Sequence, residues 1–296
     1  MSLLDIKGLR IEFPSRRGTL VAVDNVSIHV QPGEVLGVVG ESGAGKSTIG
    51  NAVIGLLEPP GEMTGGEIYL QGERIDNLSD GEKRRMRGRR IGMIFQDPLT
   101  SLDPLQTIES QLVETIELHL KLGETKAKAR AVDLLRQVGI PDPELRVKQY
   151  PHQFSGGMRQ RVVISLALAA EPELIIADEP TTALDVSVQA QIMALLKRLC
   201  RERGTAVILI THDMGVIAET TDRVAVLYAG RIAEIGPTRN VLSSPSHPYT
   251  VGLMASTPST TGTMHTLSQI PGSMPNLRAI PKGCAFNARC DKAISA

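Results

Sequence analysis

The stretch that most constrains this chain is Gly40–Ser47, which has the sequence G-E-S-G-A-G-K-S and follows the apolar run V-L-G-V-V at 35–39. It fits the spacing G-x-x-x-x-G-K-[S/T] of a phosphate-binding loop. Glycines let the backbone curl so that several N–H groups converge on one anion, and the N-terminus of a following helix adds its positive end. A strand, this loop and a helix therefore predict an α/β nucleotide-binding fold.

Each position of this loop has an expected role. Lys46 is expected to supply a point charge for the β- and γ-phosphates, and the Ser47 hydroxyl to ligand Mg²⁺. The other positions expected to bind ATP are Gly40, Ser42, Gly43, Ala44, Gly45 and Thr48. The alternative is a chance glycine-rich turn, which the preceding strand and the following helix disfavour.

A second motif supplies the carboxylates that hydrolysis needs. The short apolar run L-I-I-A at 174–177 leads directly into Asp178 and Glu179. We expect Asp178 to lie at the carboxyl end of this strand, beside the phosphate loop, and to hold Mg²⁺ through water. Glu179 is then expected to orient or deprotonate the attacking water. Without a phosphate loop upstream, the same pattern would equally fit a strand that ends in two surface acids.

The pattern along the chain predicts mostly alternating strands and helices. Alternating residues at 2–36 predict β-hairpins, and 97–170 is mostly helical. A helix from Lys46 is expected to stop at the E-P-P-G of 58–61. Further strands are predicted within 64–96, where a basic helical stretch at 79–90 interrupts them, and at 34–39, 174–177, 205–210 and 223–235, with a helix at 186–203. This order favours a mostly parallel sheet covered by helices, followed by a loop-rich tail from about 243 to 283.

Composition excludes several classes of protein. Lys and Arg together number 32, as do Asp and Glu, so the net charge is zero and gives no reason to expect a nucleic-acid partner. The longest apolar run, at about 162–170, is too short to span a membrane. The start M-S-L-L-D-I-K-G lacks the apolar core of a signal peptide. Three cysteines are too few for a disulfide scaffold and fit a reducing cytosol.

Between the two motifs lies F-S-G-G-M-R-Q-R at 154–161, and here the sequence resembles the ABC transporter ATPases. Their signature is L-S-G-G-Q, from which this chain differs at Phe154 and Met158. Together with Y-P-H-Q at 150–153 and A-D-E-P-T-T-A-L-D-V at 177–186, the motif is similar to that of the dipeptide/oligopeptide importer ATPases. The resemblance covers roughly residues 3–290.

The resemblance implies an α/β fold with a P-loop NTPase (RecA-like) core and an antiparallel β subdomain. In this arrangement residues 1–242 form the ATPase domain, with its core at 1–96 and 159–242. An inserted α-helical subdomain occupies 97–158. A loop-rich C-terminal extension occupies 243–296 and is expected to be truncated.

The resemblance also assigns four more site residues. Gln96, in I-F-Q-D-P, matches the glutamine that contacts Mg²⁺, and Asp185, in A-L-D, matches the D-loop aspartate. His212, in I-T-H-D, matches the switch histidine near the γ-phosphate. Phe13 stands where the family places an aromatic ring against adenine. Taken alone, Gln96 and His212 would equally fit solvent-facing positions, and Phe13 would fit the core.

Ser155 and the amides of Gly156 and Gly157 are expected to form a second anion-binding nest at the start of a helix at 158–170. Because one chain carries one phosphate loop and one such signature, the resemblance implies that ATP is clasped head to tail between two subunits. The second ATPase subunit is expected to be a distinct homologous chain, with a homodimer as the alternative.

The other partners are also implied by the resemblance. They are two transmembrane permease subunits, lying against the helical subdomain, and indirectly an extracytoplasmic peptide-binding protein. The expected location is peripheral, on the cytoplasmic face of the inner membrane. The expected function is ATP hydrolysis that powers import of di- or oligopeptides. Alternatives are nickel or glutathione as cargo, a soluble ABC ATPase acting on ribosomes or DNA, and a non-hydrolysing regulator, which Glu179 and His212 disfavour.

Two cysteines near the end of the sequence form a further motif. Cys284 and Cys290, in G-C-A-F-N-A-R-C, resemble the segment that binds an iron–sulfur cluster through four cysteines in peptide-importer ATPases. The next cysteine of that pattern would fall just beyond Ala296, so the full-length chain is expected to carry the cluster. The alternative is a pair of exposed, reduced cysteines. Cys200, on the apolar side of a helix at 189–199, is expected to be a packed small residue.

Overall fold

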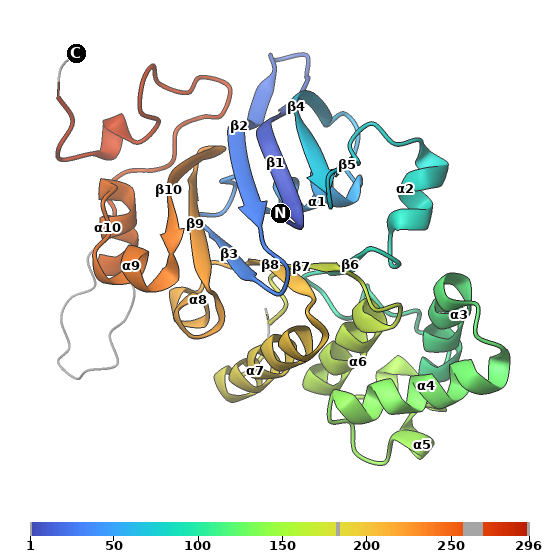
Figure 1. The fold of residues 1–296 in the computed structure, drawn as a ribbon. Helices are drawn as coiled ribbons and strands as arrows, with labels where there is room; N and C mark the ends of the chain where they lie inside the picture. The colour runs from blue at the N-terminus through green and yellow to red at the C-terminus, as the bar shows by residue number, and fades with distance from the viewer. Residues whose placement is uncertain (1, 182–183, 257–268, 295–296) are drawn as a thin grey trace. The chain divides into compact units, whose positions relative to one another are not determined.

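The computed structural model describes residues 2–181, 184–256 and 269–294. The chain forms two compact units (Figure 1). The first unit comprises Met1–Gln31, Val35–Asn77 and Ile210–Ala296, and the second comprises Pro32–Glu34 and Leu78–Leu209. The predicted domain boundaries at 97, 158 and 242 stay predictions.

The first unit contains an antiparallel sheet with the strand order β2-β1-β4-β5. Its strands are β1 (Leu4–Phe13), β2 (Leu20–Val30), β4 (Glu62–Leu70) and β5 (Glu73–Arg74). Leu4 of β1 pairs with Val30 of β2 on one side and with Leu70 of β4 on the other. All three side chains are fully buried. The alternation of apolar and polar residues in this region therefore predicted the hairpin and its buried face correctly.

A second group of strands in the first unit leads to the phosphate loop. Strand β3 (Val35–Val39) runs parallel to β9 (Arg223–Tyr228), which pairs antiparallel with β10 (Arg231–Pro237). All five residues of β3 are buried, as is typical of a parallel strand covered on both faces. The predicted hairpin at 223–235 is confirmed.

Helices of the first unit differ from the prediction at two places. They are α1 (Lys46–Ile54), α8 (Met214–Thr220), α9 (Thr238–Ser243), α10 (Pro248–Ala255) and the 3₁₀ turn η2 (Asn287–Arg289). Helix α1 ends before the expected E-P-P-G, because Gly55 adopts a left-handed conformation with φ 69° and caps it. The tail was expected to be loop-rich from residue 243, but it begins with α10. Residues 257–268 of the tail lie outside the described residues.

The second unit contains strands in the order β8-β7-β6 and most of the longer helices. The strands are β6 (Ile91–Ile94), β7 (Leu174–Asp178) and β8 (Ala206–Ile210). The helices are α2 (Asp80–Met86), α3 (Ile108–Leu120), α4 (Glu124–Gln137), α5 (Pro143–Arg146), η1 (Pro151–Gln153), α6 (Gly156–Leu168) and α7 (Val186–Arg203). The mostly helical character predicted for 97–170 is confirmed.

Helices α3, α4 and α6 pack on one another (Figure 1). Helix α3 buries Leu112 and Ile116, which are four residues apart, and α4 buries Ala127 and Ala131 at the same spacing. None of the helices within the described ranges has the length and apolar character needed to cross a bilayer.

Candidate nucleotide site

The phosphate loop of the first unit joins the end of β3 to the start of α1, and its glycines are there for steric reasons. A Cβ atom at Gly40 would lie 2.2 Å from the carbonyl oxygen of Leu227, and one at Gly45 would lie 2.4 Å from that of Ala22. Both distances are far below van der Waals contact, and both residues have positive φ angles, of 153° and 97°. Side chains at these positions would push the loop away from β9 and β2.

Lys46 is the first residue of α1 and is only 7% exposed. Its Nζ donates hydrogen bonds to the carbonyl oxygens of Gly40 and Glu41, at 2.8 and 3.0 Å. The ammonium group is thus held against the loop that carries it. By contrast, Ser42, Gly43 and Ser47 are exposed, so the loop offers solvent-accessible polar groups next to a buried positive charge, which is the character of an anion-binding site.

The other predicted loop residues lie in the same turn. Ala44 is fully buried, and its N–H donates to the carbonyl of Glu41 at 3.1 Å while its carbonyl accepts from Gly230 at 3.0 Å. Thr48 lies in the first turn of α1. The loop is therefore anchored at Ala44, with Ser42 and Gly43 exposed before it and Ser47 exposed after the buried Gly45 and Lys46.

In the second unit the predicted hydrolytic residues follow two neighbouring strands. Strands β6 and β7 run parallel, with Ile94 in register with Ala177. Asp178 is the last residue of β7 and Glu179 follows it. The Nε2 atom of Gln96 donates a hydrogen bond to Oε2 of Glu179 at 3.0 Å. Two residues predicted from separate motifs are thereby in direct contact.

Ser155 is the N-cap of α6, and its Oγ accepts from the N–H of Met158 at 3.4 Å. The helix begins at Gly156, two residues earlier than expected, so both signature glycines lie in its first turn. A Cβ at Gly157 would approach Cγ1 of Val188 to 2.8 Å, which explains why this turn can pack so closely on α7.

The signature also lies beside the predicted D-loop. Leu184 is next to Gly156, at 3.5 Å from the position of a Cβ there. Asp185 is exposed and is the N-cap residue of α7. Ala183 of the D-loop motif lies outside the described residues.

His212 and Phe13 belong to the first unit. His212 is exposed and follows Thr211, whose N–H donates to the carbonyl of Val38 at 3.2 Å. This bond aligns the histidine segment with the end of β3, next to the phosphate loop. Phe13 ends β1 and is half-buried, with its ring against Gly61, where a Cβ would come within 2.6 Å of Cε1. The roles expected for the histidine and the phenylalanine stay predictions.

The three cysteines have different environments. Cys200 is fully buried on α7, and burial raises the pKa of its thiol to about 12, as befits a packed residue. Cys284 is exposed and Cys290 is half-buried. The Sγ of Cys284 lies 3.8 Å from Nε2 of His247, at the edge of a cavity of about 220 Å³. Among residues 2–181, 184–256 and 269–294, no three His, Cys, Asp or Glu side chains gather as a metal site.

Three residues that sequence reasoning did not single out are linked at the phosphate loop. Arg289 binds the carboxylate of Glu41, and the Tyr249 hydroxyl accepts a hydrogen bond from the Glu41 N–H. The partners are 248 and 208 residues apart in the chain. No local pattern in the sequence marks such a contact.

Comparisons with known proteins place the chain among relatives of one family. The model of the family described as ABC transporter matches residues 23–182, and that of the "Oligopeptide/dipeptide transporter, C-terminal region" matches 233–296. The oligopeptide transport ATP-binding protein OppD of Bacillus subtilis is 52% identical, covering 87% of this chain and 72% of its own. DppD of the same organism, a dipeptide transport ATP-binding protein, is 48% identical, with coverages of 97% and 86%. Escherichia coli OppD is 47% identical, with coverages of 99% and 87%.

Solved structures give the same result for the fold. The dimeric post-hydrolysis form of the ATP-binding cassette MJ0796, bound to ADP and Pi, superposes with a TM-score of 0.71 at 30% identity. It covers 80% of this chain and 99% of its own. CbiO1 from Clostridium perfringens, described as part of the ABC transporter complex cbiONQ, superposes with a TM-score of 0.70 at 28% identity, with coverages of 82% and 91%.

Proposed function

Because this chain belongs to the ABC transporter ATPases, in their oligopeptide and dipeptide branch, we propose that it is the ATP-hydrolysing subunit of an importer of di- or oligopeptides. The observation that carries the catalytic part is the hydrogen bond from Gln96 to Glu179. It fixes the orientation of a carboxylate at the end of a parallel strand, where hydrolysis needs a base. The peptide cargo is supported by relatives whose names specify oligopeptides and dipeptides, which favours peptides over nickel or glutathione.

The residues divide the work of phosphate transfer between them. The loop amides and Lys46 bind the phosphates, and the buried position of Lys46 supports this because a desolvated charge attracts an anion more strongly. Glu179 orients or deprotonates the attacking water. His212 is assigned to the γ-phosphate, supported by the bond that holds its neighbour Thr211 beside β3.

Mg²⁺ fits the donor set. Ser47 offers a hydroxyl, Asp178 a carboxylate and Gln96 an amide oxygen, which are the hard oxygen ligands that this ion takes. When bound, the ion neutralises charge on the β- and γ-phosphates. An iron–sulfur cluster does not fit the described residues, because no three His, Cys, Asp or Glu side chains gather there as ligands. The proposal therefore contains no step through a cluster.

The proposal includes a second ATPase subunit, either a distinct homologue or a second copy of this chain. Two observations support it: the exposed start of α6 at Ser155 and Gly156, and the dimeric state of the MJ0796 cassette. ATP would join the phosphate loop of one subunit to the signature of the other. The family resemblance assigns Phe13 to the adenine ring and Asp185 to the dimer interface.

Attachment to permease subunits would make the protein peripheral at the cytoplasmic face of the inner membrane. Large apolar side chains in the second unit are exposed, which supports a protein partner there; they are Leu99 (61%), Leu105 (85%), Leu118 (67%) and Leu145 (70%). An extracytoplasmic peptide-binding protein would deliver the cargo.

The test is steady-state ATP hydrolysis by the purified chain and two variants. Glu179→Gln should lower kcat by about a hundredfold or more while MgATP still binds, since the amide cannot take a proton. Lys46→Ala should lose nucleotide binding. The matched control is Glu171→Gln, which should turn over ATP like the wild type. Glu171 lies three residues before the start of β7, and its side chain is 60% exposed. Wild-type turnover in Glu179→Gln would overturn the assignment of the base.

A further inference from the structure

We propose that Arg289 and Tyr249 are positioning residues for ATP binding, because together they hold the phosphate loop in place through its second residue, Glu41. The inference rests on the proposed function, since it concerns how the same loop meets ATP. It makes the C-terminal segment part of the nucleotide site rather than an appendage to it.

Glu41 is held by its side chain. Nη1 of Arg289 donates to both carboxylate oxygens of Glu41, at 2.9 and 3.0 Å. Only 6% of the arginine side chain is exposed, against 30% for the glutamate. Without a positively charged partner, the Glu41 carboxylate would repel the triphosphate that this loop is proposed to bind. The arginine neutralises it from the side of the C-terminal segment.

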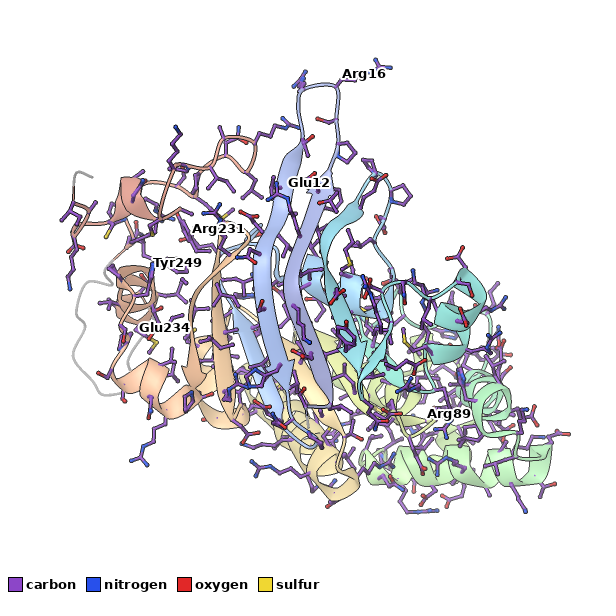
Figure 2. The ribbon with its side chains drawn as sticks, turned by 45° about the horizontal axis from the view of Figure 1, so that its top comes forward. Glu12, Arg16, Arg89, Arg231, Glu234 and Tyr249 are labelled. Atoms are coloured by element: carbon purple, nitrogen blue, oxygen red, sulfur yellow. The ribbon has the colours of Figure 1, made fainter. Side chains whose placement is uncertain are left out.

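Glu41 is also held by its backbone. Its N–H donates to the Tyr249 hydroxyl at 2.9 Å. Tyr249 lies on α10, beside β10 (Figure 2). Its side chain is fully buried. Burial raises the pKa of this phenol, so the hydroxyl stays neutral. Its oxygen accepts the bond from Glu41 without adding a negative charge beside the loop. The N–H of Glu41 is therefore engaged by Tyr249.

The arginine is itself fixed by the segment that carries it. Nε donates to the carbonyl of Pro271 at 2.8 Å, Nη2 to that of Ile270 at 3.3 Å, and Nη1 to the Tyr228 hydroxyl at 3.3 Å. The guanidinium also lies over the rings of Tyr228 and Phe286, at 5.8 and 5.9 Å from their centroids. An arginine with so many partners has little freedom to follow the loop if the loop moves.

Fixing Glu41 also fixes Lys46. The restrained Glu41 N–H belongs to the peptide unit whose carbonyl is that of Gly40. This carbonyl and the next one along the chain, that of Glu41, both accept from Nζ of Lys46. If this peptide turned, it would release the ammonium group that is to meet the β- and γ-phosphates. Arg289 and Tyr249 therefore set the position of the lysine without touching ATP.

The test measures MgATP affinity, KM and kcat on the full chain, with thermal unfolding recorded for every variant. Arg289→Gln should raise the Kd and KM for MgATP about tenfold, the size expected for a lost charged hydrogen bond. The kcat at saturating ATP should stay within about twofold of wild type. Tyr249→Phe should raise Kd and KM about threefold, since one neutral bond is lost. Arg278→Gln is the matched control, because Arg278 lies in the same segment but contacts Ser15 rather than the loop.

A double-mutant cycle separates positioning from folding. In a Glu41→Gln background the charge to be neutralised is gone, so adding Arg289→Gln should change the Kd by less than about threefold. The inference is overturned if Arg289→Gln raises the Kd for MgATP by the same factor in both backgrounds. It is also overturned if a folded Arg289→Gln protein binds MgATP with wild-type affinity. If the wild type itself fails to bind MgATP, the proposed function is at fault. If it binds and Glu179→Gln blocks turnover while Arg289→Gln has no effect, only this inference fails.

Discussion

Glu179 shows how a single residue is set up for its proposed task. Its φ angle is +46°, in the left-handed region that non-glycine residues rarely adopt. Such conformations cost on the order of 1–3 kcal/mol and persist where surrounding contacts hold them. The bond from Gln96 is one such contact. A strained backbone held by a specific hydrogen bond supports a dedicated role for this carboxylate.

The three thiols should differ in reactivity. The attacking species is the thiolate, and Cys200 is both fully buried and held as a neutral thiol by its raised pKa of about 12. In the folded protein at about pH 8, iodoacetamide should modify Cys284, which is exposed, and leave Cys200 unmodified. Peptide mass spectrometry over time measures this. Labelling in guanidinium chloride, where all three should react, is the control, and native labelling of Cys200 at the rate of Cys284 would contradict the expectation.

At the residue scale, the sequence supplied candidate site residues but not the contacts between them. Asp178 and Glu179 followed from an apolar strand that ends in acids, and Lys46 from the spacing of glycines. The contact between Gln96 and Glu179 depends on the register of β6 and β7, which no local pattern encodes. The left-handed conformation of Glu179 could not be predicted either, since this region favours glycine and asparagine rather than glutamate.

At the scale of elements, periodicity predicted the type of each segment, and capping decided where it ended. Helix α7 spans the predicted 186–203. Helix α6 starts two residues early, because the Ser155 side chain caps it and both glycines are accepted in its first turn. Helix α10 was missed because Ser, Pro and His around it resemble a loop. Its N-cap is His247, whose Nδ1 accepts from the Tyr249 N–H at 3.1 Å, with Pro248 as its first residue.

Glu234 should make the attachment of α10 depend on pH. Glu234 is a residue of β10 (Figure 2). Its carboxylate accepts from the N–H groups of Ser246 and His247, at 2.9 and 3.0 Å, just before the helix. Although burial alone would raise the pKa of Glu234, these hydrogen bonds lower it overall. A carboxyl group whose pKa is lowered in the folded state stabilises the fold fully at pH values above its ordinary pKa of about 4.3. This stabilisation is lost as the pH falls through the lowered pKa of the folded state.

Glu234→Gln should therefore lower the free energy of unfolding at neutral pH, and the difference from wild type should shrink as pH falls below about 4. Urea unfolding across this range measures it. Glu58→Gln, at an exposed position, is the control and should match wild type at every pH. A difference for Glu234→Gln that stays constant or grows in acid would contradict the sign of this effect.

At the scale of the whole molecule, the C-terminal extension is less separate than the sequence implied. Composition changes near residue 243, which predicts an added tail. Yet the described residues from 210 onward belong to the same compact unit as the phosphate loop. The contacts responsible join residues more than 200 positions apart, such as Glu41 with Tyr249. Sequence reasoning on one chain detects periodicity and motifs, and long-range pairing of this kind is outside its reach.

The dimer proposed above can be tested with a substitution that the chain itself tolerates. A Cβ at Gly156 would lie 3.5 Å from Cδ2 of Leu184, which is ordinary van der Waals contact, and Gly156 is exposed. Gly156→Ala should therefore fold normally. In the dimer, the added methyl group would face the phosphates bound by the partner and would keep them from the amides at the start of α6.

The experiment uses the Glu179→Gln variant, in which turnover is blocked. MgATP should convert this variant to a dimer, either with a second copy of itself or with its homologous partner, and ADP should not. Light scattering measures the mass of the particle. Adding Gly156→Ala should weaken that dimer by about tenfold or more, the effect of a lost charged hydrogen bond, while MgATP still binds the monomer. Gly81→Ala is the matched control, because Gly81 also lies in the first turn of a helix of the second unit and has only the flexible Arg85 side chain near it, at 3.8 Å. If Gly156→Ala dimerises like its parent, the signature does not receive the phosphates, and the two-subunit site must be built from other residues.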